Sequence, residues 1–99
     1  QMWITDLQLI ATDAPSGQKI LNETLDIAEM LIKKNISYGD SALSPIRIFS
    51  QADNQEQIKI RIDDKINRIK NGSGFAGDND IDDMIGYLIL LKIAKANSN

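Results

Sequence analysis

The 99-residue sequence contains no cysteine and no histidine. Without cysteine, the chain cannot form a disulfide, a thiolate metal site or a thiol nucleophile. Without histidine, it lacks the usual general base, the imidazole ligands of zinc and the Ser-His-Asp triad. Any catalysis must therefore use carboxylates, lysines, tyrosines, hydroxyl groups or a bound metal ion.

The sequence also lacks an excess of positive charge and a long apolar run. Its net charge of -3 argues against binding to duplex nucleic acid, which depends on excess lysine and arginine to neutralise phosphates. No stretch is long enough to cross a membrane, and the N-terminus lacks the features of a signal peptide. A cytoplasmic protein is expected, and a small phosphate-bearing ligand held through a divalent cation remains compatible with the charge.

The hydrophobic residues of the sequence are mainly aliphatic. Hydrophobic residues make up 42% of the chain and aromatic residues only 5%, so isoleucine and leucine must supply the core. A chain of this length forms one small domain, and it buries a modest fraction of its surface. Helix-rich chains of this size often complete their cores by association, so a homo-oligomer (a dimer or a larger assembly) is expected.

Three segments carry apolar residues at the spacing of an α-helix. The first runs over about residues 18–35. The second follows Asp53, the expected N-cap, and ends before Gly72, the expected C-cap. The third begins at Asp78 or Asn79 and frays in the last five residues. A fourth, short helix is expected at 44–51, and the pattern therefore predicts an all-α bundle of three long helices and one short helix.

The remaining segments are less defined. Ser44 and Pro45 suit the N-cap and first position of the short helix. Residues 2–9 fit a strand, a lead-in or an extra helical turn equally well. Residues 12–17 are expected to form a loop, because proline and glycine interrupt regular structure there.

Isoleucine stripes mark the expected core faces of the two later helices. In the second long helix the stripe consists of Ile58, Ile62, Ile66 and Ile69. In the third it consists of Ile81, Ile85, Leu88, Ile89 and Ile93. The third helix is nevertheless apolar almost all round, as expected of a buried helix.

Acidic residues cluster on both sides of the glycine-rich segment 72–77. At about 100° per residue, Glu56 and Asp63 share one side of their helix, and Asp80, Asp83 and Tyr87 share one side of theirs. The latter side is roughly opposite the isoleucine stripe, so the stripe alone would direct these acids to solvent. If the acids converge, oxygen-only ligation without histidine or cysteine indicates Mg²⁺ or Mn²⁺.

Ordinary structural roles also explain the same acids. Aspartates are frequent at helix starts, where they cap and complement the macrodipole. Asp63 and Asp64 could pair with Lys65 and Arg68 on a solvated face. The segment 72–77 is not a phosphate-binding loop, since it lacks the preceding strand and the Lys-Ser/Thr pair.

Three segments together resemble a known family: "KNISYGDSALSPIRIFS", "IKIRIDDKINRI" and "DNDIDDMIGYLILLKIA". They look like the MazG-like all-α nucleotide pyrophosphohydrolases, in the phage branch described as nucleotide-modification-associated domains. The resemblance covers residues 18–96, with 1–17 as an N-terminal lead-in and 97–99 as a frayed tail. "DIDDMIGYL" is similar to the family's Glu-x-x-Asp helix, which aligns Asp80 with the glutamate and Asp83 with the aspartate.

The resemblance implies a Mg²⁺-dependent enzyme that converts a nucleoside triphosphate to the monophosphate and pyrophosphate in the cytoplasm of a bacterial host. It implies five candidate metal ligands, of which Asp63 and Asp83 would also be catalytic: Glu56, Asp63, Asp64, Asp80 and Asp83. In the same interpretation, five residues would contact the substrate: Lys34, Tyr38, Lys65, Arg68 and Tyr87.

The chain departs from the family pattern in its acidic helix. The Glu-Glu-x-x-Glu element is not present as written: Glu56 is isolated, and Asp63 and Asp64 are followed by Lys65. This leaves two other functions open. One is a non-catalytic nucleotide-binding protein that sequesters a cyclic or other signalling nucleotide in phage anti-defence. The other is a protein-interaction module.

Overall fold

The computed structural model describes residues 2–45, 53–72 and 79–97. Within these residues the chain forms four α-helices and no strand, so the all-α prediction is confirmed. The helices are Ile4–Ala11 (α1), Gly17–Ser37 (α2), Asn54–Asn71 (α3) and Asp80–Asn97 (α4). None of the helices in the described ranges is long and apolar enough to cross a membrane. The short helix expected at 44–51 lies almost entirely outside the described residues.

The helix ends follow the capping residues. The Asp53 side chain accepts a hydrogen bond from the backbone N–H of Gln55 at 3.3 Å, which confirms it as the N-cap of α3. Gly72 ends α3 with φ of 64°, a left-handed conformation that favours glycine. At the start of α4, the Asn79 side chain accepts from the backbone N–H of Asp82 at 3.1 Å. The expected alternative cap, Asp78, lies outside the described residues.

Most of the N-terminal segment 2–9, for which the sequence predicted no single structure, belongs to helix α1. The backbone carbonyl of Trp3 accepts hydrogen bonds from the N–H groups of Asp6 and Leu7, and α1 begins at Ile4. At the other end Ala11 is buried against α2. Tertiary contact with α2 therefore stabilises a helix of eight residues, a length that is marginal in isolation.

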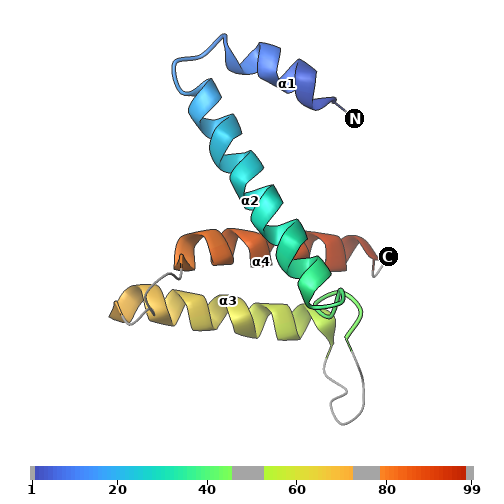
Figure 1. The fold of residues 1–99 in the computed structure, drawn as a ribbon. Coiled ribbons are helices and arrows are strands. Elements are labelled where there is room, and N and C mark those ends of the chain that lie inside the picture. The colour runs from blue at the N-terminus through green and yellow to red at the C-terminus, as the bar shows by residue number, and fades with distance from the viewer. Residues whose placement is uncertain (1, 46–52, 73–78, 98–99) are drawn as a thin grey trace.

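The helices are arranged as a pair with a projecting arm (Figure 1). Helices α3 and α4 lie side by side and antiparallel, α2 crosses α4 and continues beyond it, and α1 folds back along the far end of α2. The radius of gyration is 15.9 Å, whereas a compact domain of this length has about 12.6 Å. The α1–α2 arm thus extends away from the α3–α4 pair.

The core lies between α3 and α4, and α2 crosses it at one point. Ile58, Leu90 and Ala94 are buried there, with Leu31 of α2 packed against them. Gly86 forms the crossing point: a Cβ on this residue would lie 3.2 Å from Cδ1 of Leu31. The absence of a side chain at Gly86 is what lets α2 approach α4 closely.

The isoleucine stripe of α4 does not face the core, contrary to the sequence-based prediction. Its members are 37% to 59% exposed: Ile81, Ile85, Leu88, Ile89 and Ile93. The opposite face is the buried one, because the small residues Gly86 and Ala94 there permit close helix packing. The prediction failed because both faces of α4 are apolar, so periodicity alone did not distinguish them.

The predicted core face of α3 is confirmed at the N-terminal end of the helix and wrong at the C-terminal end. Ile58 is buried and Ile62 is half-buried, but Ile66 and Ile69 are 50% and 42% exposed. Near that end the inward positions are taken by basic side chains that pair with acids of α4. The same pairing explains why those acids face the protein.

Candidate functional site

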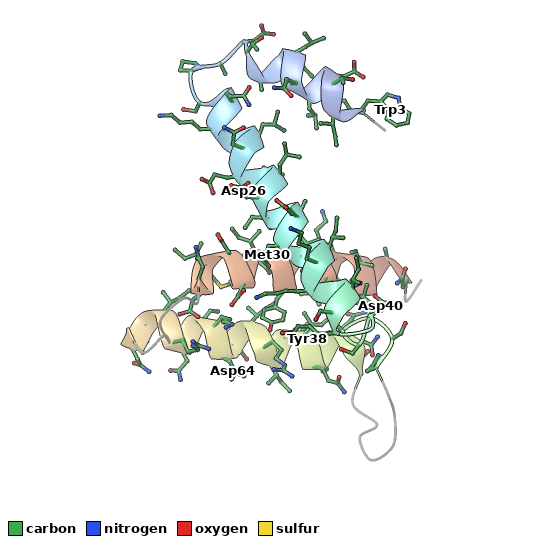
Figure 2. All side chains as sticks on the ribbon, viewed as in Figure 1. Trp3, Asp26, Met30, Tyr38, Asp40 and Asp64 are labelled. Carbon is green, nitrogen blue, oxygen red and sulfur yellow. The ribbon has the colours of Figure 1, made fainter. Side chains whose placement is uncertain are left out.

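Three short stripes of polar side chains, one from each of α2, α3 and α4, are joined by ion pairs near the C-terminal end of α2. Tyr38 marks this end of α2 in Figure 2. Each stripe has helical spacing, so each presents one face of its helix. The stripes are Lys34 on α2 with Tyr38 at its C-cap, Arg61, Lys65 and Arg68 on α3, and Asp80, Asp83 and Tyr87 on α4. The close approach of α2 and α4 at Gly86 brings the first and third stripes together.

Asp83 is the centre of the charged contacts. Its Oδ1 lies 3.0 Å from Nζ of Lys34, and its Oδ2 lies 3.1 Å from Nζ of Lys65. The side chains of Asp83 and Lys65 are only 15% and 13% exposed, so this pair is largely shielded from water. One carboxylate therefore links all three helices.

Asp80 lies beside this centre with a less complete set of partners. Its Oδ1 is 3.5 Å from Nζ of Lys65 and 3.4 Å from Nε of Arg68. These are ion-pair distances, but within the described residues this buried oxygen accepts no hydrogen bond. Asp80 thus balances the charge of Lys65 and Arg68 while one of its oxygens remains without a hydrogen-bond donor.

These contacts shift the pKa values of two groups. Burial raises the pKa of the Asp83 carboxyl, but hydrogen bonds and charge from Lys34 and Lys65 outweigh burial and hold it below its ordinary value. The hydrogen bond to Asp83 raises the pKa of the Lys34 ammonium, and partial burial opposes it less strongly. Both groups are therefore charged at neutral pH.

The stability contributed by Asp83 is expected to disappear in acid. A carboxyl with a lowered folded pKa stabilises the protein above its unfolded pKa of about 3.9, and this contribution is lost as pH falls through the folded pKa. Urea unfolding of the wild type and of Asp83→Asn should differ most at about pH 7 and much less at about pH 2. A difference that stays constant across this range would contradict the prediction.

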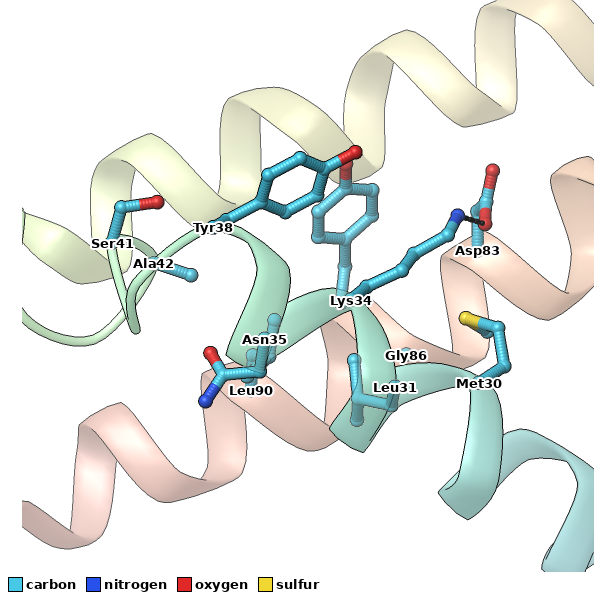
Figure 3. A pocket seen from close by; sticks show the side chains of 11 residues that line it. Met30, Leu31, Lys34, Asn35, Tyr38, Ser41, Ala42, Asp83, Gly86 and Leu90 are labelled. Atoms are coloured by element: carbon cyan, nitrogen blue, oxygen red, sulfur yellow. Dashed lines mark hydrogen bonds and ion pairs between the residues drawn. The ribbon is translucent and has the colours of Figure 1, made fainter.

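Two adjoining cavities open beside the charged centre. The first has a volume of about 90 Å³ and lies between α2 and α4, with Lys34 and Asp83 at one side (Figure 3). The second, of about 370 Å³, lies toward α3 and includes Gln57 and Arg61. The two cavities share four lining residues: Tyr38, Ser41, Ala42 and Tyr87. The two cavities, together called the recess, therefore adjoin at these side chains, two of which are tyrosines.

The predicted substrate contacts are largely gathered here. Lys34, Tyr38 and Tyr87 line the cavities, whereas Lys65 pairs with Asp80 and Asp83 beside them and Arg68 pairs with Asp80. That these residues contact a substrate stays a prediction, whereas their closeness to one another is a feature of the fold.

The predicted metal ligands are distributed differently. Asp80 and Asp83 lie together, whereas Asp63 and Asp64 are exposed on α3. Glu56 is exposed, pairs with Lys59 and lies nine residues before Lys65, about 13 Å along the helix. In the described part of the chain, no three acidic side chains are close enough to hold a metal ion. Because Lys34, Lys65 and Arg68 already face the two adjacent aspartates, this arrangement does not fit a resident Mg²⁺.

Arg61 and Gln57 were missed by the sequence-based interpretation. Both line the larger cavity. Arg61 could have been found, because it stands four residues before Lys65 and seven before Arg68 and so continues the same helical face. Gln57 stands four residues before Arg61 and extends this face by one more turn, so the same spacing could have indicated it.

No protein family, curated protein or solved structure matches this chain. The resemblance to the MazG-like group therefore stays a prediction, and the function must be argued from the site itself.

Proposed function

We propose that this chain binds a small nucleotide in the recess between α2, α3 and α4. The observation that carries the proposal is the local charge. Four cationic side chains and two carboxylates line this recess or lie beside it, giving a surplus of positive charge in a chain whose net charge is -3: Lys34, Arg61, Lys65, Arg68, Asp80 and Asp83. A concentrated positive site on an acidic chain favours an anionic ligand.

The two cationic groups at the cavities suit phosphate oxygens. The Lys34 side chain is 49% exposed, and its ammonium has three donors, one of which goes to Asp83. Arg61 lines the larger cavity and has a planar guanidinium that can bind phosphate through two parallel hydrogen bonds. Lys65 and Arg68, shielded and paired with the aspartates, would instead add to the positive field.

The aromatic rings of Tyr38 and Tyr87 suit the base of the nucleotide. Tyr38 lines both cavities and is 66% exposed, so much of its ring surface is open to a planar ligand. Stacking of a base on an aromatic side chain contributes about 1–3 kcal/mol and tolerates any base. The larger cavity, at about 370 Å³, is within the range of small-molecule sites.

Binding without turnover is the form that the described geometry favours. The carboxylates that a metal ion would need are engaged with Lys34, Lys65 and Arg68. Mg²⁺-dependent release of pyrophosphate, which the family resemblance implies, stays a second prediction. It is a separate outcome of the experiment that tests binding.

Isothermal titration with nucleoside triphosphates, diphosphates and cyclic dinucleotides tests the proposal. Arg61→Ala and Tyr38→Ala are each expected to weaken binding by tenfold or more, the equivalent of about 1.4 kcal/mol. Lys59→Ala is the matched control, because Lys59 also lies on α3 but pairs with the exposed Glu56. Its affinity should equal that of the wild type.

The fate of the nucleotide separates the two functions. Intact nucleotide recovered by mass spectrometry, with affinity unchanged by chelator, supports sequestration. Pyrophosphate released only in the presence of Mg²⁺ or Mn²⁺ supports hydrolysis. Absence of heat and of thermal stabilisation with every nucleotide would overturn both and favour a protein-interaction module.

Self-association is also part of the proposal. The chain exposes 7768 Å² of surface, whereas a folded monomer of 11.0 kDa exposes roughly 5,600 Å². The excess is larger than the roughly 800 Å² that each partner buries in a standard interface. Burial of apolar surface between copies would compensate for the small core of the single chain.

A further inference from the structure

One face of α4 points away from both of its neighbouring helices and is apolar. It carries Ile81, Ile85, Leu88 and Ile89, each 37% to 59% exposed. The opposite face already packs against α2 and α3. A helix that is apolar on all sides is typical of the interior of a protein. The described residues of a single chain cover only half of α4.

We propose that this face of α4 packs against α4 of a second copy of the chain, in antiparallel orientation. The proposal rests on the self-association inferred above and assigns its surface. A two-fold dimer uses the same patch on both partners, so one helix face must be complementary to itself. Aliphatic side chains at helical spacing meet this requirement, because each ridge can fit into the groove of the other helix.

Charge determines the orientation of the two helices. Asp80 and Asp83 in the first turn of α4 already face Lys65 of the same chain, so the acidic side chain of this turn that is left for a second copy is Asp82, and the other end of the helix contains Lys92 and Lys95. An antiparallel pair sets the acidic end of each copy beside the basic end of the other, and it also opposes the helix dipoles favourably. A parallel pair would set aspartate against aspartate and lysine against lysine.

The main rival surface is the groove between α1 and α2. It has a volume of about 280 Å³ and is lined by uncharged, mostly apolar residues such as Leu7, Ile10 and Leu21. No charge pattern in its lining selects an occupant or an orientation. The proposal therefore assigns the α4 face, and a position on α2 serves as the comparison.

Disulfide trapping tests the assignment directly, because the chain has no cysteine of its own. Leu88 lies at the middle of α4, so in an antiparallel pair Leu88→Cys meets its own copy and forms a disulfide-linked dimer. Ile81→Cys lies seven residues from the middle, so its two copies are separated by roughly 20 Å and cannot form a disulfide. A mixture of Ile81→Cys and Lys95→Cys should form the mixed disulfide.

Ile32→Cys is the control, because Ile32 is 60% exposed on α2 and lies outside the proposed interface. It should remain unlinked. If Ile32→Cys formed a disulfide-linked dimer and Leu88→Cys did not, the antiparallel α4 interface would be overturned. A disulfide between two copies of Ile81→Cys would overturn it as well.

A second measurement separates this proposal from the others. Leu88→Glu should convert the wild-type dimer to a monomer in analytical ultracentrifugation, while nucleotide binding persists. A dimer that survives Leu88→Glu would overturn the α4 interface and leave self-association standing. A wild type that is monomeric at every concentration would overturn both and leave nucleotide binding untouched.

Discussion

Asp83→Ala is expected to lower the free energy of unfolding by about 3 kcal/mol, because it leaves a shielded lysine without its closest partner. The Asp83 carboxylate is 3.1 Å from Lys65, whose side chain is 13% exposed, and 3.0 Å from Lys34. For a domain of this size the loss corresponds to a fall of roughly 10–20 °C in Tm, measurable by circular dichroism. Because Asp83 of α4 pairs with Lys34 of α2, the contact of α2 with α4 should also loosen.

Glu29→Ala is the control for this effect. Glu29 pairs with Lys33 at 2.8 Å, an even shorter distance, but both side chains are more than 60% exposed. Exposed pairs of this kind contribute little, so no measurable change in Tm is expected. Equal effects of Asp83→Ala and Glu29→Ala would show that shielding of the Asp83 pair has no energetic consequence.

Gly86→Val should separate α2 from α4 and cost about 1–3 kcal/mol, the usual range for overpacking. A Cβ at Gly86 would already lie 3.2 Å from Leu31, so the larger branched side chain must displace α2. Gly86 also lines the smaller cavity, so nucleotide affinity should fall together with stability. Urea unfolding and titration calorimetry measure the two losses.

Two further variants test this steric explanation. Gly86→Ala should cost little, because the flexible end of the Leu31 side chain needs to move only a few tenths of an ångström. Glu23→Val places the same valine on an exposed position of α2 and should leave nucleotide binding unchanged. If Gly86→Val matched Glu23→Val in both measurements, close approach at Gly86 would not hold α2 in place.

Local signals in the sequence were sufficient to predict the three longer helices, the ends of α3 and the start of α4. Asp53, Gly72 and Asn79 were identifiable because capping depends on hydrogen bonds within a few residues and on the conformational freedom of glycine. Helix α1 was not identifiable, because its eight residues depend on contact with α2. Local sequence cannot report a contact between segments that lie far apart along the chain.

The site was partly predictable, because the side chains that share one face of a helix follow from local sequence. The common side of Asp80, Asp83 and Tyr87 follows from helical geometry, and so does that of Arg61, Lys65 and Arg68. What helical geometry could not supply was the rotation of each helix relative to its neighbours. The acids were expected to face solvent or a metal ion, and they face Lys34, Lys65 and Arg68 instead.

The sequence by itself determined an all-α chain without thiol or imidazole chemistry, the ends of α3 and the start of α4, and the side chains that share a helix face. Only the tertiary structure decided which face of each helix is buried. Both faces of α4 are apolar, so the hydrophobic effect alone does not choose between them. Gly86 and Ala94 permit close packing on one face, and the ion pairs of Asp83 stabilise the protein only in that orientation.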